Sequence, residues 1–110
     1  PDFIPHVLQE AIDSSLYDEV APVAGAEGIH WAKALAQQEG ILTGISGGAS
    51  FAVAQQIAEQ APAGSVILCM LPDTGERYMS TPLFDGIEAD MNEEERSLSL
   101  STPGFQLAVA

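Results

Sequence analysis

The sequence has little positive charge. Three Lys and Arg side chains stand against 16 Asp and Glu, and the formal net charge at pH 7 is −13. Nucleic acids and anionic membrane surfaces are recognised through Lys and Arg, so neither is an expected partner. The acidity itself favours solubility and indicates no particular site.

Cysteine is scarcer still. The single cysteine, Cys69, excludes an internal disulfide. It lies in the apolar run 66–71, which is typical of a buried packing residue, whereas a reactive thiol needs partial exposure and positive surroundings. His6 has no second His or Cys at ligand spacing, so we expect no metal site.

Long apolar runs are also absent. The longest is far shorter than the roughly 20 residues of a membrane-spanning helix. The first residues include no initiator Met, basic segment or signal-peptide core. We therefore expect a cytoplasmic protein from which this chain is a piece.

What the chain does contain fits one small α/β domain. It has 110 residues, 46% of them hydrophobic and only 6% aromatic, which favours closely packed α/β layers over a β-sandwich. Apolar periodicity predicts helices and strands that alternate from residue 19 onward. The predicted helices are 6–12, 26–39, which ends at Gly40, and 49–60. The predicted strands are 19–23, 41–43 and 65–71.

Strand, helix, strand, helix, strand is the order of a parallel βαβαβ unit with right-handed crossovers. Ligands bind at the carboxyl edge of such sheets. Two loops, 44–48 and 72–77, are predicted to lie together at that edge. Ser46 is the only side chain in the first loop that can exchange a hydrogen bond with a ligand.

Less specific interpretations of both loops stay open. The glycines of residues 44–48 can serve close packing in a tight turn instead of a ligand. Asp73 and Thr74 can end a strand as an Asx-type turn. Lys33 is expected on the surface, and Arg77 is expected to pair with a carboxylate.

The character of the sequence changes after residue 86. Residues 90–96 are acidic, and residues 97–110 are rich in serine and end in an apolar piece. We expect residues 1–86 to form the α/β domain and residues 87–110 to form a tail that is loosely held unless another chain covers it.

Two segments resemble the cysteine synthases, also called O-acetylserine sulfhydrylases. Residues 40–49, GILTGISGGA, are similar to the family segment EG-I-L-x-G-I-S-x-G-A. Residues 71–81, LPDTGERYMST, are similar to P-x-x-G-E-R-Y-L-S-T. Both occur in the order and spacing of the family, and the resemblance covers residues 1–86 well and the tail loosely.

The resemblance implies the second (tryptophan synthase β-like) fold type of pyridoxal-phosphate enzymes. The family replaces the acetate of O-acetylserine by sulfide. Ser46 is then the implied partner of the cofactor's pyridine nitrogen. A serine at a helix N-terminus, unlike a carboxylate, does not favour the protonated ring, which suits elimination over transamination. The other implied cofactor-binding residues are Gly44, Ile45, Pro72, Asp73 and Thr74.

No residue matches the Schiff-base lysine of the family, its phosphate-binding loop or its substrate-carboxylate loop. We therefore expect no catalytic residue, no retained pyridoxal phosphate and no β-replacement activity in this chain alone. The expected partners are the missing N-terminal portion of the enzyme, a small amino-acid substrate and a second copy. The alternatives are a cystathionine β-synthase or a related enzyme, and a catalytically dead, self-associating module.

Overall fold

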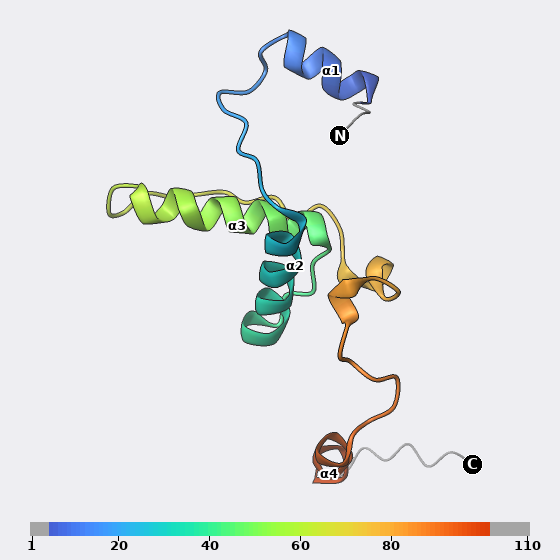
Figure 1. The fold of residues 1–110 in the computed structure, drawn as a ribbon. Coiled ribbons are helices and arrows are strands. Elements are labelled where there is room, and N and C mark those ends of the chain that lie inside the picture. Colours follow the sequence, from blue (N-terminus) through green and yellow to red (C-terminus); the bar gives the residue numbers. More distant parts are fainter. Residues whose placement is uncertain (1–4, 102–110) are drawn as a thin grey trace, which may run out of the picture.

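A computed structural model of the chain describes residues 5–101. This part is helical, and the helices form no compact bundle (Figure 1). The four α-helices are α1 (His6–Asp13), α2 (Gly25–Ala34), α3 (Ile45–Gln60) and α4 (Glu93–Ser101). A π-helical segment, η1 (Leu35–Glu39), extends α2, and two short 3-10 helices follow α3, namely η2 (Gly75–Tyr78) and η3 (Pro82–Phe84).

The three predicted helices are present. The second runs through α2 and η1 and ends at Gly40, whose φ of 68° is the left-handed conformation expected after a helix. The third begins at Ile45, one turn before the predicted start at Ala49. Among residues 5–101, no helix has the length and hydropathy needed to cross a membrane.

The three predicted strands are not confirmed. The described residues contain no strand, so they do not form the expected parallel βαβαβ unit. A strand requires a neighbour that completes its hydrogen-bond ladder, and residues 5–101 contain only one isolated bridge, between Thr43 and Thr74. Segments 19–23, 41–43 and 65–71 therefore remain irregular.

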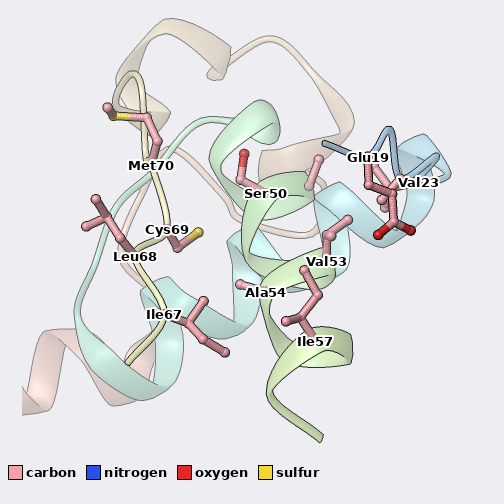
Figure 2. Close-up of a pocket in the computed structure, with 12 residues that line it drawn as sticks. Glu19, Val23, Ser50, Val53, Ala54, Ile57, Ile67, Leu68, Cys69 and Met70 are labelled. Carbon is pink, nitrogen blue, oxygen red and sulfur yellow. The ribbon is translucent and has the colours of Figure 1, made fainter. Parts of the chain in front are cut away.

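The segment after α3 nevertheless has the side-chain pattern of a strand. It doubles back along α3, with Ile67 and Cys69 directed toward the helix and Leu68 and Met70 directed away (Figure 2). The exposed fraction alternates accordingly, from 97% at Val66 to 38% at Ile67 and 95% at Leu68. An extended backbone with one free face produces this alternation.

The core is the crossing of α2 and α3 (Figure 1). Small residues let the two backbones approach closely. A Cβ at Gly48 would overlap the carbonyl oxygen of Gly28 and lie 2.7 Å from the backbone nitrogen of Ala32. Trp31 and Phe51 flank the crossing edge to face, with ring centroids 5.5 Å apart.

Much apolar surface stays uncovered around this small core. The radius of gyration is 19.2 Å, whereas a compact domain of this size has about 13 Å. Large apolar side chains are exposed along 66–70 and also at Val20 and Ile57. The described residues by themselves do not bury a core of the expected size.

The acidic run near the C-terminus is more ordered than its composition indicates. Asn92 and Glu95 begin α4 with reciprocal hydrogen bonds: the Asn92 side chain accepts from the amide of Glu95, and the Glu95 carboxylate accepts from the amide of Asn92, both at 2.8 Å. No residue of α4 is buried. The division at residue 86 stays a prediction, and residues 102–110 of the tail lie outside the described residues.

Replacing Gly48 by alanine tests the helix crossing. The added methyl group meets backbone atoms of α2, which cannot rotate away, so we expect a loss of about 1–3 kcal/mol in the free energy of unfolding. Gly25→Ala is the matched control, because a Cβ at that helical position meets nothing within 4 Å. If both variants have the same urea midpoint as the unmodified chain, this packing is contradicted.

Candidate functional site

The two loops singled out by the sequence lie side by side. The amide of Gly44 donates to the carbonyl of Asp73 (3.3 Å), and the amide of Gly75 donates to the carbonyl of Leu42 (3.4 Å). These bonds make the antiparallel bridge between Thr43 and Thr74. The predicted adjacency is confirmed, but an antiparallel contact between two turns produces it rather than neighbouring parallel strands.

Thr43 anchors this contact, a role that the sequence analysis missed. Its side chain is 2% exposed, and its hydroxyl donates to the carbonyl of Asp73 at 3.4 Å. A Cβ at Gly47 would overlap that hydroxyl. Gly47 and Gly48 therefore serve close packing, which is the alternative left open above. The sequence signal for the buried anchor was a threonine directly before the glycine-rich turn.

Ser46 has a different environment. It lies in the first turn of α3, is exposed, and its hydroxyl has no hydrogen-bond partner within residues 5–101. The first amides of a helix have no acceptor within it, and this end carries partial positive charge. The turn therefore offers an exposed hydroxyl beside the first amides of the helix, between the half-buried Ile45 and the buried Gly47.

The second turn uses its side chains internally. The hydroxyl of Thr74 accepts from the amide of Glu76 at 3.2 Å and caps η2. The Tyr78 hydroxyl donates to Oδ2 of Asp73 at 2.6 Å. Pro72 is exposed. Thr74 is thus engaged in the turn, as the less specific interpretation proposed, and offers its hydroxyl less freely than Ser46.

The Asp73 carboxylate is only half satisfied. Its Oδ1 is buried and has no hydrogen-bond partner among the described residues. This atom lies where a Cβ of Gly44 would stand, at the N-terminus of α3. The hydrogen bond to Asp73 raises the pKa of Tyr78, and burial and the carboxylate charge add to it, while Arg77 acts in the opposite direction.

Other sequence predictions have mixed outcomes. Cys69 is half-buried and directed toward α3, and burial raises the pKa of its thiol. Arg77 is exposed and forms no ion pair within residues 5–101, so its predicted pairing is wrong for this part of the chain. Nowhere in the described segment do three His, Cys, Asp or Glu gather as a metal site would require.

Two hollows lie beside α3 and α2, and Ser46 lines neither of them. A groove of about 420 Å³ separates α3 from the segments 19–23 and 67–70, and its lining is mostly apolar (Figure 2). A second hollow of about 200 Å³ lies between α2 and η3, with Lys33 and Asp85 at its wall. Neither hollow includes a residue predicted to bind the cofactor.

Tyr78 predicts a specific dependence of stability on pH. Its pKa is raised in the folded chain above the unfolded value of about 10. The stabilisation by its hydrogen bond is therefore complete below about pH 10 and is lost as pH rises through the folded pKa. We expect the difference in urea midpoint between the unmodified chain and Tyr78→Phe to be constant from pH 7 to 9 and to shrink above pH 10. A difference that persists or grows at pH 11 would show that the bond is not formed.

Comparison with known proteins gives consistent relatives, although no family model matches the chain. It is 49% identical over 88 residues to the O-ureido-L-serine synthase of Streptomyces lavendulae, covering 80% of this chain and 26% of that protein. It is 39% identical over 87 residues to a probable cysteine synthase of Bacillus subtilis, covering 79% and 27%. A cysteine synthase of Staphylococcus aureus is 38% identical over 82 residues, covering 74% and 25%.

Solved structures agree with these matches. The crystal structure of an O-ureido-L-serine synthase has a TM-score of 0.71 and 44% identity over 88% of this chain and 29% of its own. A lysine-to-alanine mutant of that enzyme with bound O-ureido-L-serine has a TM-score of 0.73 and 44% identity over 94% and 31%. The chain spans between a quarter and a third of the length of these relatives and matches their C-terminal part. The chain is therefore homologous to the C-terminal part of cysteine synthases and of O-ureido-L-serine synthase.

Proposed function

We propose that this chain is the C-terminal portion of a pyridoxal-phosphate-dependent enzyme of β-replacement, a cysteine synthase. The reaction joins sulfide to the β-carbon of O-acetylserine as acetate leaves. The observation that carries the proposal is the bridge between Thr43 and Thr74, which holds the Ser46 turn beside the Asp73 turn. The two turns carry both family motifs, in a chain 38–49% identical to family members.

The described residues fit a planar cofactor with a polar ring atom at one point. Ser46 presents an exposed hydroxyl at the start of α3 that has no hydrogen-bond partner within residues 5–101. A buried oxygen of Asp73, likewise without a partner in that part of the chain, lies beside the same turn. Ser46 would hold the ring nitrogen, the backbone of Gly44 and Ile45 would lie along the ring edge, and Pro72, Asp73 and Thr74 would line the same end.

When bound, pyridoxal phosphate supplies the electron sink that lets the β-substituent leave. The chain's own contribution is to choose the protonation state of the ring nitrogen. A neutral hydroxyl at the positive end of α3 gives the nitrogen no anion to keep a proton on it. The covalent lysine and the phosphate-binding loop must come from elsewhere, because the only lysine, Lys33, lines the hollow against η3.

The missing strands belong to the same proposal. In the complete enzyme, segments 19–23, 41–43 and 65–71 would become strands of a parallel sheet that receives its other strands from the N-terminal portion. The alternating exposure of residues 66–70 and the groove between this segment and α3 support this. Residues 1–86 would then complete the cofactor-binding domain, with residues 87–110 as its tail.

A second acceptor is favoured by one observation. The identity to O-ureido-L-serine synthase is 49%, against 39% and 38% for the two cysteine synthases compared. By its chemistry, O-ureido-L-serine is an L-serine derivative that β-replacement forms when the hydroxyl of hydroxyurea displaces acetate. We therefore keep O-ureido-L-serine synthesis as the alternative function of the same site.

A chimera tests the function. The chain replaces the matching C-terminal segment of the Streptomyces lavendulae enzyme, and the product is assayed with O-acetylserine and either sulfide, hydroxyurea or homocysteine. Turnover supports β-replacement at a site that this chain completes, and an acceptor preference that differs from that of the unmodified Streptomyces lavendulae enzyme is contributed by this chain. A folded chimera that binds pyridoxal phosphate but turns over with none of them would refute the function and favour a catalytically dead module.

Ser46→Asp in this chimera tests the role of the hydroxyl. An aspartate would keep the ring nitrogen protonated, so we expect turnover to fall by about tenfold or more. Ser97→Asp, which adds the same charge on the exposed α4, is the control and should leave turnover unchanged. Equal turnover of the two variants would exclude Ser46 as the partner of the nitrogen.

Leu68→Lys tests the proposed strand. The side chain is 95% exposed in this chain, so the variant should unfold in urea as the unmodified chain does. In the chimera the same lysine would be buried in the sheet, with an expected cost of about 3 kcal/mol or more. Leu98→Lys on α4 is the control in both proteins. A chimera that tolerates Leu68→Lys would mean that the segment stays at the surface.

A further inference from the structure

Asp73 lies at the centre of the contact between the two turns. Its carbonyl accepts two hydrogen bonds, from the amide of Gly44 (3.3 Å) and from the hydroxyl of Thr43 (3.4 Å). Its carboxylate accepts a third from the hydroxyl of Tyr78 (2.6 Å). One residue therefore joins the start of α3 to η2.

The side chains of this pair pack directly against the N-cap of α3. A Cβ at Gly44 would overlap Oδ1 of Asp73 and lie 2.6 Å from Cε2 of Tyr78. Gly44 is itself buried. The absence of a side chain at residue 44 thus makes room for the carboxylate and the aromatic ring, and the pair limits how the first turn of α3 can move.

We propose that Asp73 and Tyr78 are positioning residues for Ser46, because their hydrogen bond clamps the second turn against Gly44 and so fixes the first turn of α3. This inference rests on the proposed function, in which Ser46 meets the ring nitrogen. Tyr78 does not have to touch the cofactor, and Asp73 positions Ser46 in addition to lining the ring. Tyr78 holds the carboxylate, the carboxylate packs on Gly44, and Ser46 follows two residues later.

A purely structural role for the Asp73–Tyr78 pair does not explain why a carboxylate stands at residue 73. The second carboxylate oxygen is buried without a hydrogen-bond partner among the described residues, and such an atom costs free energy that an apolar side chain would avoid. Its position beside the helix N-terminus is favourable for an anion. A carboxylate kept at that cost against Gly44, which precedes Ser46 by two residues, indicates a geometric requirement of the site rather than the most stable packing.

The first test is made in the complete 110-residue chain. With Tyr17→Phe as background, absorbance near 295 nm follows Tyr78 alone, since the chain has two tyrosines. Asp73→Asn removes the charge and should lower the titration midpoint of Tyr78. An unchanged midpoint would show that the pair does not form, whatever the function of the protein.

The second test is made in the chimera. Asp73→Asn and Tyr78→Phe should each lower kcat about tenfold, the double variant should lose no more than either one, and Tyr17→Phe should have full activity. In a Ser46→Ala background, both variants should have little further effect, because the group they position is gone. Matched urea midpoints show that folding is not the cause.

The outcomes separate the two proposals. A chimera without activity in its unmodified form overturns the proposed function. An active chimera in which Asp73→Asn turns over at the full rate overturns the positioning role alone. Equal losses with and without the Ser46 hydroxyl also overturn it, because they would show that the pair acts by general stabilisation.

Discussion

The close approach of α2 and α3 is the constraint on which the rest of the structure depends. Gly48 meets the backbone of α2 where no side chain would fit, and Gly47 leaves room for the buried hydroxyl of Thr43. Small residues at a helix crossing make few side-chain contacts but allow the two backbones to pack closely. Because both glycines lie in the first turn of α3, this packing also fixes where the helix begins.

The geometry of the candidate site depends on where α3 begins. Thr43 is buried against α3, and its hydroxyl donates a hydrogen bond to the carbonyl of Asp73. The bridge between Thr43 and Thr74 holds the second turn next to the first. Ser46 remains exposed at the rim of this assembly. The buried threonine and the contacts between the turns thus link the helix packing to the exposed hydroxyl of Ser46.

Sequence reasoning was sufficient where local rules dominate. Apolar periodicity and the glycine after Glu39 predicted the helices and the left-handed end at Gly40. The adjacency of the two turns was predicted from a parallel sheet that the described residues do not form, and an antiparallel bridge produces it instead. Sequence reasoning placed the start of α3 one turn late because it read the glycines as loop residues. Periodicity cannot reveal that a glycine inside a helix serves backbone contact with another helix.

The predicted strands and the roles of individual side chains required tertiary information. Residues 66–70 have the alternation of a strand, but a ladder needs neighbours that residues 5–101 do not supply. Asp73 was predicted as a group that faces the ligand. Its hydrogen bond to Tyr78 forms because η2 turns the chain so that the tyrosine, five residues later, returns to the carboxylate. A motif identifies the residues of a site but does not predict which of their side chains form hydrogen bonds with one another.

One measurement tests the central claim most directly: the crystal structure of the chimera with pyridoxal phosphate bound. Our account predicts that the Ser46 hydroxyl lies at hydrogen-bond distance, about 3 Å, from the ring nitrogen, with the turns still joined between Thr43 and Thr74. A ring nitrogen that meets another group, or turns that have separated, would contradict it.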